Sequence, residues 1–276
     1  MPAFVFISGY LSKDVDKCRK TAFTSFFIPF VFFNTLWNLL AFVFLSVPFS
    51  FITPGWALWY LLSMFIWRLF LKDLVRIKGI VPLSLAIGLC AGIFKEFDAL
   101  LSLSRTLVFL PFFLMGYFLS EEHLFSFKRP SRLFSIVIFG VIMGFAFLLA
   151  RTNIVPVEFL YGSSSFSDFT LPLWIGLSAR AFLYLIGIYF IFVLVNVMPS
   201  RPTFFSKIGQ NTFPVYILHT YLLVLVFWVN HLFDALWLQI ILCIISSVCI
   251  TYFLSRNCVN RIFNKVLQFL IGCIQR

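Results

Sequence analysis

The chain alternates long apolar runs with short polar stretches. The runs are continuously apolar and lack the alternation of inward and outward residues that marks a membrane β-barrel strand, so they predict helices. A helix needs about 20 apolar residues to cross a bilayer. Eight runs reach or approach that length: residues 21–45, 56–75, 79–94, 103–120, 133–150, 173–197, 213–230 and 235–254. The pattern predicts an all-α, polytopic transmembrane helix bundle, with a broken or re-entrant helix at 79–94 because that run is short and carries Pro82.

The basic residues between the runs alternate along the chain. Seventeen of the 21 Lys and Arg residues lie in every second connection, at 12–20, 68–78, 128–132, 201–207 and 256–276. The other connections hold only Lys95, Arg105 and Arg151. Because Lys and Arg are retained on the cytoplasmic side of a membrane, we expect a multi-pass protein of the cell membrane. Its basic loops and C-terminus are expected to be cytoplasmic.

The two ends of the chain differ from the eight runs. Residues 1–11 are apolar but reach only about 16 Å as a helix, about half of the hydrocarbon core. We therefore expect a partial N-terminal span that lacks its beginning. Residues 255–276 predict a cytoplasmic amphipathic helix that anchors the chain to the membrane surface. Its apolar positions recur at offsets of three and four: Val259, Ile262, Phe263, Val266, Leu267, Leu270 and Ile274.

Composition agrees with a single integral membrane domain over residues 1–276. The chain is 62% hydrophobic and 11% charged, with a mean hydropathy of +1.03, whereas soluble domains are about 45–50% apolar and about 25% charged. The net charge of +11 follows the topology, so it does not indicate a nucleic-acid partner. The six cysteines show neither CxxC nor Cys/His spacing, so we expect free thiols and no metal site.

Polar residues at membrane depth are the candidates for chemistry. Arg180 lies inside an apolar run, where a charge costs about 2.5–3.5 kcal/mol, so it either binds a substrate or reaches toward the surface and backbone carbonyls. His219 is a weak candidate for a general base; a neutral hydrogen-bonding role between helices is equally consistent. Asn34 and Asn38, one helical turn apart, are typical of helix pairing.

A second group of polar residues falls near the predicted outer face. It comprises Glu96, Asp98, Arg105, Arg151, Glu158 and Asp168, and an ordinary solvated rim is the simplest interpretation. The longest outer loop, RTNIVPVEFLYGSSSFSDFTLP, starts at Arg151 and carries Tyr161, Gly162 and a run of serines. Tyr161 could stack on a sugar and the hydroxyls could bind it; a flexible Gly/Ser connector is the alternative.

Five stretches, in this order, resemble the integral-membrane acyltransferase-3 family. They are MPAFVFISGYLSK, LWYLLSMFIWRLF, SRTLVFLPFFLMGYFL, LYGSSSFSD with the following run, and IGQNTFPVYILH. Within that family, the stretches resemble the branch of fucose 4-O-acetylase-like proteins, which modify bacterial surface polysaccharides. The resemblance implies O-acylation of a sugar hydroxyl, with acetyl-CoA or another acyl-CoA as co-substrate and no bound cofactor. Arg105 and Arg180 match positions where the family tends to carry arginine, and Tyr161 and His219 match the family pattern as well. We expect Arg105, Arg180 and Tyr161, together with the rim residue Arg151, to bind the substrate.

The resemblance also shows a departure from the family pattern. Members begin with one further helix, which bears a basic residue and the histidine regarded as the catalytic base, and this chain starts at Met1. We expect a late start or a truncated copy, with little or no activity for the 276-residue chain alone. The alternative from another functional class is a transporter of polysaccharide intermediates, but the sequence shows no internal repeat of the kind transporters often have.

Overall fold

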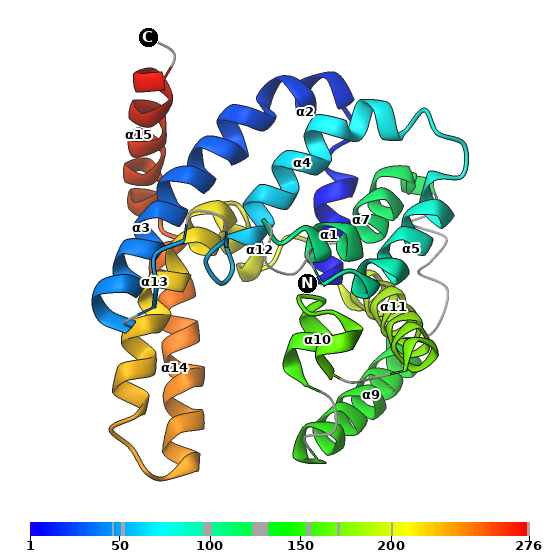
Figure 1. Ribbon diagram of the computed structural model, residues 1–276. Coiled ribbons are helices and arrows are strands. Elements are labelled where there is room, and N and C mark those ends of the chain that lie inside the picture. The colour runs from blue at the N-terminus through cyan, green and yellow to red at the C-terminus, as the bar shows by residue number, and fades with distance from the viewer. Residues whose placement is uncertain are drawn as a thin grey trace. The chain divides into compact units, whose positions relative to one another are not determined.

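The structure, a computed structural model, describes residues 1–45, 47–50, 53–95, 101–122, 132–152, 156–169, 172–199 and 201–274 (Figure 1). Every regular element in these ranges is helical, which confirms the all-α class. The chain divides into two compact units. Unit 1 comprises Met1–Phe23 and Leu62–Met198, and unit 2 comprises Thr24–Leu61 and Pro199–Arg276.

Each of the eight predicted runs coincides with a helix, and further helices lie between and beyond the runs. Unit 1 contains α1 (Pro2–Tyr10), α2 (Val15–Ala22), most of α4 (Trp59–Leu74), α5 (Ile80–Cys90), η2 (Ala91–Ile93), α7 (Leu103–Phe118), α9 (Arg132–Thr152), α10 (Val157–Tyr161), η3 (Phe166–Phe169) and α11 (Leu173–Val197). Unit 2 contains most of η1 (Phe23–Phe27), then α3 (Ile28–Leu45), α12 (Phe204–Gly209), α13 (Thr212–Asn230), α14 (Leu236–Leu254) and α15 (Asn257–Ile274).

Several of these helices are apolar enough for a membrane. Four are also long enough to cross it, namely Val15–Phe44, Leu173–Val197, Thr212–Asn230 and Leu236–Leu254. Shorter apolar helices cover Ile80–Ile93, Leu103–Phe118 and Leu133–Leu148. These helices indicate a multi-pass membrane protein. The run predicted to be broken is an α-helix that tightens into the 3₁₀ turn η2 at its end.

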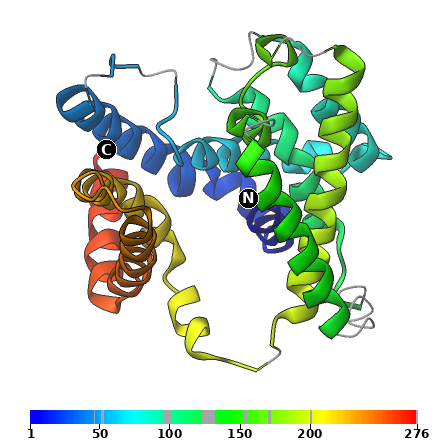
Figure 2. The same ribbon diagram turned by 90° about the horizontal axis from the view of Figure 1, so that it is seen from below.

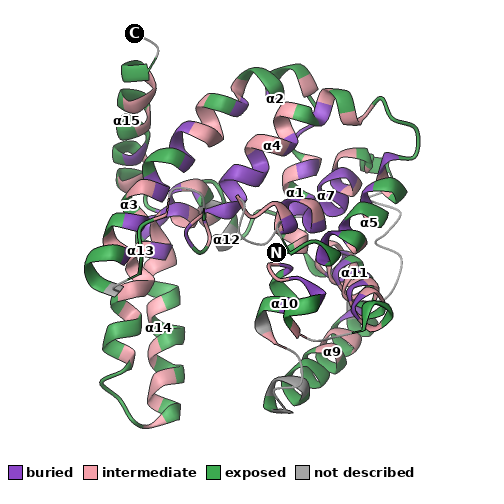
Figure 3. Ribbon diagram, viewed as in Figure 1, coloured by how far each residue is buried: buried purple, intermediate pink, exposed green. Residues whose placement is uncertain are grey.

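The core of unit 1 is built around α7, which is largely buried (Figure 3). The short helix α1 packs closely against it. At Gly9 an added Cβ would lie 1.9 Å from the carbonyl oxygen of Phe113, and at Gly116 it would lie 1.9 Å from that of Phe6. Small residues let two helix backbones approach in this way. The N-terminal segment, expected as a partial span, is therefore an integral packing element of unit 1.

Polar groups join α7 to its other neighbours. The indole Nε1 of Trp67 on α4 donates to the carbonyl of Thr106 at 3.1 Å, and the hydroxyls of Ser63 and Thr106 are 2.7 Å apart. From α11, the Tyr184 hydroxyl donates to the carbonyl of Val108 at 2.8 Å. Figure 2 shows α9, in green, alongside α11, in yellow-green. Satisfied polar pairs of this kind hold helices together where the surrounding solvent is apolar.

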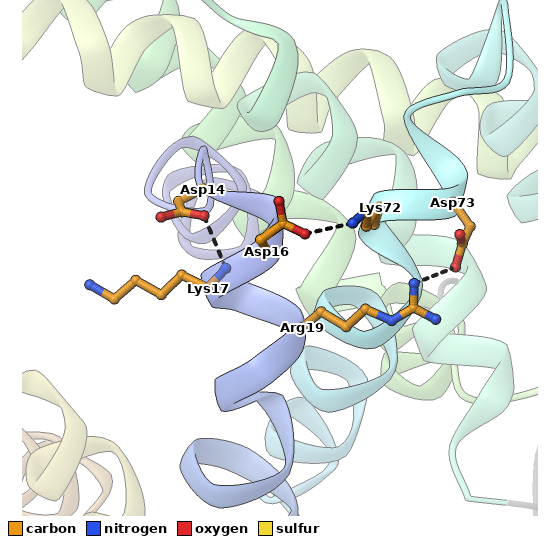
Figure 4. Close-up of polar contacts among 6 residues, drawn as sticks. All are labelled: Asp14, Asp16, Lys17, Arg19, Lys72 and Asp73. Atoms are coloured by element: carbon orange, nitrogen blue, oxygen red, sulfur yellow. Dashed lines mark hydrogen bonds and ion pairs between the residues drawn. The ribbon is translucent and has the colours of Figure 1, made fainter.

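Two basic stretches of unit 1, residues 12–20 and 68–78, lie together, as the alternating topology requires. Lys72 pairs with Asp16 at 2.7 Å and Arg19 with Asp73 at 3.2 Å (Figure 4). The pairs are about half-exposed, so solvent screens them and their contribution to stability is small. Lys13 donates to the backbone carbonyls of Tyr117 and Leu119 at the end of α7, and burial lowers the pKa of its ammonium. Two basic stretches predicted to share one side of the membrane thus meet beside the end of α7; which side faces the cytoplasm stays a prediction.

In unit 2 a segment without regular helix folds back along α3. The side-chain oxygen of Asn34 accepts a hydrogen bond from the backbone N–H of Gly55 at 2.7 Å, and that of Asn38 accepts one from Ser50 at 3.4 Å. The Tyr216 hydroxyl of α13 donates to the carbonyl of Ala57. Non-helical backbone at membrane depth requires partners inside the protein. The two asparagines, expected to pair helices, instead bind this segment.

Replacing Asn34 with leucine should destabilise unit 2. The substitution leaves the N–H of Gly55 without its buried acceptor, which costs about 1–3 kcal/mol. We expect a lower melting temperature for the detergent-solubilised protein, measured by tryptophan fluorescence. The matched control is Thr35→Val, because the exposed Thr35 hydroxyl bonds only to the Val31 carbonyl of its own helix among the contacts described for it. Equal melting temperatures for both variants would contradict the role of Asn34.

The amphipathic helix predicted for the tail is present as α15. Its buried Phe263 stacks on Phe33 of α3, with ring centroids 5.6 Å apart. The turn from α14 to α15 is held by the Asn211 side chain, which donates to the Ser255 carbonyl at 2.7 Å and accepts from Asn260 at 2.7 Å. These contacts fix where α15 starts and which edge of it packs against α3 and α13 of unit 2.

Candidate functional site

The segment from α10 to η3 is folded onto the helix ends of unit 1. Gly162 ends α10 with a φ of +64°, a left-handed conformation that favours glycine, and its carbonyl accepts a 2.8 Å hydrogen bond from Ser104 at the start of α7. Asp168 of η3 pairs with Lys95 at 3.1 Å and accepts from the backbone N–H of Ser165 at 3.2 Å. The Gly/Ser loop is therefore anchored at both helical turns, which does not fit the flexible-connector alternative.

Arg180 is held between aromatic rings of this segment. Its side chain is 2% exposed, and its guanidinium carbon lies 4.8 Å from the ring centroid of Phe166 and 5.7 Å from that of Phe159. A desolvated cation–π contact contributes about 2 kcal/mol. The guanidinium thus lies inside the protein, which does not fit the alternative of a side chain reaching to the surface.

Two glycines make room for this arrangement. A Cβ at Gly92 would lie 2.7 Å from Nη1 of Arg180 and 2.6 Å from the Phe166 ring. A Cβ at Gly176, one turn before Arg180 on α11, would also lie 2.6 Å from that ring. The space that holds the guanidinium and the Phe166 ring exists because η2 and α11 carry no side chain at these points.

A second arginine lies under the same segment. Arg105, in the first turn of α7, has its guanidinium carbon 5.9 Å from the ring centroid of Tyr161. Tyr161 closes α10 and is 49% exposed. Because Tyr161 and Phe159 belong to the same helical turn, α10 contacts both Arg105 and Arg180. The structure therefore gathers three of the four candidate substrate-binding residues around α10.

The remaining outer-rim residues are placed differently. Arg151, the fourth candidate, is exposed at the end of α9, and the contact described for it is with the ring of Phe147 on the same helix, 5.2 Å away. Glu158 is exposed. Glu96 and Asp98 lie outside the described residues. Among the described rim residues, Arg151 and Glu158 are thus exposed, whereas Asp168 is paired with Lys95.

Sequence reasoning missed the residues that surround Arg180. Phe159 and Phe166 are two of 40 phenylalanines, and nothing in their local pattern distinguishes them. Gly92 lies in the short run that was predicted to be broken, and no pattern in the sequence distinguishes Gly176. The available signal was a pair of glycines, Gly92 and Gly176, in the two runs that meet at Arg180. This signal can be interpreted only once it is known that the two runs pack together.

His219, the candidate base, belongs to α13 of unit 2. Its Nδ1 lies 3.1 Å from the carbonyl oxygen of Val215, and its ring lies 5.8 Å from that of Tyr216. A carbonyl oxygen can only accept, so Nδ1 carries the hydrogen and the lone pair is on Nε2.

Comparison with known proteins identifies the family. A family model described as an acyltransferase domain, that of acyltransferase-3, matches residues 1–256. The chain belongs to the acyltransferase-3 family. The match spans both units and every candidate residue, and membership implies a membrane acyltransferase. No curated protein and no solved structure gives a match. The acyltransferase-3 match ends one residue before α15 begins.

Proposed function

We propose that the chain is a membrane O-acyltransferase, in the first place an O-acetyltransferase of the fucose 4-O-acetylase-like branch. It moves an acyl group from acyl-CoA to a sugar hydroxyl of a cell-surface polysaccharide or its precursor. The observation that carries the proposal is the pair of arginines, Arg105 and Arg180, gathered around α10 in a chain of an acyltransferase family. The family match gives no support to the transporter alternative.

The chemistry asks for a base and for cationic donors. The sugar oxygen attacks the thioester carbonyl while a base takes the hydroxyl proton, and the tetrahedral oxyanion collapses to the ester with release of the CoA thiolate, which is then protonated. Fixed positive groups stabilise the negative charge that develops on these oxygens. In unit 1, Arg105 and Arg180 are the candidates for that role; no base is assigned beside them, because His219 belongs to the other unit.

The acceptor and the donor make different demands. An exposed aromatic ring such as that of Tyr161 offers a flat apolar surface and a hydroxyl to a sugar, and Arg105 beneath it can donate to sugar oxygens. Arg151 adds a further cation at the exposed rim. The donor carries phosphates, which charge-assisted hydrogen bonds from Lys and Arg bind well. We propose that the basic stretches face the cytoplasm, where acyl-CoA is found.

The test is the acetyl content of the surface polysaccharide in the organism that encodes the chain. Deleting the gene should lower the O-acetyl signal in the NMR spectrum of the purified glycan, and the wild-type gene should restore it. Arg105→Gln should restore at most about a tenth of it, because losing a charge-assisted hydrogen bond of about 1.5–3 kcal/mol weakens binding about 10- to 100-fold.

The control is Ser178→Ala, which removes an exposed hydroxyl that donates to the Trp174 carbonyl of its own helix and should restore acetylation in full. An unchanged acetyl content after deletion, with less polysaccharide reaching the surface, would overturn the proposal in favour of a transporter. Full restoration by Arg105→Gln would leave the acyltransferase standing and remove Arg105 from its site.

A further inference from the structure

Helix α15 has three faces, and only two have an evident purpose. One edge packs on α3 through Phe263. A polar face holds Asn257, Arg261, Asn264, Lys265 and Gln268. Between them runs a third face, here called the free strip, made of Cys258, Ile262, Val266, Phe269 and Cys273. Spacings of four, four, three and four residues place all five on one line of an α-helix.

The free strip is apolar and exposed. Ile262 is 64% exposed and Phe269 is 71% exposed. It is not the lipid face of a further membrane span, because α15 is not among the helices apolar enough to cross a bilayer in the described part of the chain. Between its two ends, α15 carries Arg261 and Lys265 together with three amide side chains. A soluble environment along its whole length would leave five aligned apolar residues in water.

The cations border the strip on one side. Arg261 immediately precedes Ile262, and Lys265 immediately precedes Val266, so each cation lies about 100° around the helix from a strip residue. The aliphatic stems of Arg and Lys can cover apolar surface while their charged ends reach outward to phosphate groups. An apolar strip with flanking cations is the arrangement found in helices that lie at a membrane–water boundary.

We propose that the free strip of α15 binds the boundary between the lipid headgroups and acyl chains, with Arg261 and Lys265 binding the phosphates of anionic lipids. The position of α15 in the chain supports this partner. Two residues separate α15 from the end of α14, a helix long and apolar enough to cross the membrane. The first turn of α15 is therefore expected at the level of the lipid headgroups. The Asn211 contacts then hold that junction in place. The acyltransferase match ends at residue 256, so α15 lies outside it.

The test measures the depth of single side chains in the full-length protein reconstituted in phosphatidylcholine vesicles with and without phosphatidylglycerol. The five exposed cysteines are replaced by alanine and the buried Cys18 is kept; they are Cys90, Cys243, Cys249, Cys258 and Cys273. An environment-sensitive fluorophore is attached at Phe269→Cys on the strip or at Gln268→Cys on the polar face. We expect a blue-shifted emission at 269, quenched at least twofold by lipids bearing a nitroxide, whereas the fluorophore at 268 should be quenched by iodide in the buffer.

Two other results would overturn the proposal, and a third would remove its anionic-lipid part. Iodide quenching at 269 equal to that at 268 would place the strip in water. Protection at 269 from both quenchers would place it against protein, either a second copy or another partner. Finally, the nitroxide quenching at 269 should rise with phosphatidylglycerol, and the double variant Arg261→Gln/Lys265→Gln should abolish this rise. A rise that persists would remove the anionic-lipid part of the proposal.

Discussion

Replacing Gly9 or Gly116 with alanine should strongly destabilise unit 1. In each case the added Cβ would lie 1.9 Å from a backbone carbonyl oxygen of the other helix, so α1 and α7 must move apart rather than adjust a side chain. Overpacking of this kind costs about 1–3 kcal/mol, and occasionally more; contact with backbone places these variants at about 3 kcal/mol. The melting temperature in detergent should fall by about 6 °C or more. Trp67, which stacks on Phe113 at 5.2 Å, reports the transition by its fluorescence.

The matched controls are Gly140→Ala and Gly144→Ala on α9. No atom lies within 4 Å of a Cβ built at either position, and alanine is favoured over glycine inside a helix by about 0.5–1 kcal/mol. These variants should melt at the wild-type temperature or slightly above it. If Gly9→Ala and Gly116→Ala melt like these controls, the close approach of α1 and α7 does not stabilise the protein.

Replacing Arg180 with methionine should abolish most activity without unfolding the protein. Methionine keeps the apolar stem among Phe159 and Phe166 and removes the charge. On the proposed function, loss of a fixed cation at the reacting oxygens or the bound substrate should lower the acetylation that the gene restores to the polysaccharide of the deletion strain about 10- to 100-fold. Arg180→Lys should recover only part of this activity, because an ammonium lacks the planar guanidinium that stacks between rings.

Stability distinguishes this role from a structural one. Removing the charge relieves a burial cost of about 2.5–3.5 kcal/mol, which offsets the loss of the cation–π contacts, about 2 kcal/mol. The melting temperature of Arg180→Met should therefore stay close to that of the wild type. Ser178→Ala is the control on the same helix, since the exposed Ser178 hydroxyl donates to the Trp174 carbonyl of its own helix; it should change neither quantity. A melting temperature and an activity that fall together would make Arg180 a structural residue, and unchanged activity would exclude it from the site.

The candidate residues were found from sequence to different extents. Arg180 could be singled out because a charge inside an apolar run is costly wherever the run packs. Arg105 and Tyr161 were named as well, but their contact was not, since 56 positions of chain separate them. Asn34 and Asn38 were recognised as polar residues at membrane depth, and their role was misjudged. An amide can bond to another helix or to a non-helical backbone equally well, and the pattern of one run does not distinguish the two.

What the sequence determined by itself is the helical class, the positions of the apolar helices and the amphipathic character of α15. These depend on neighbours within about one or two helical turns, and any continuous apolar run in a membrane must satisfy its own backbone as a helix. Only the tertiary structure decided the aromatic surroundings of Arg180, the backbone contact at Gly9 and Gly116, and the free strip of α15. Each of these depends on which faces of distant helices meet or stay exposed, and a glycine or phenylalanine has the same local pattern in either case.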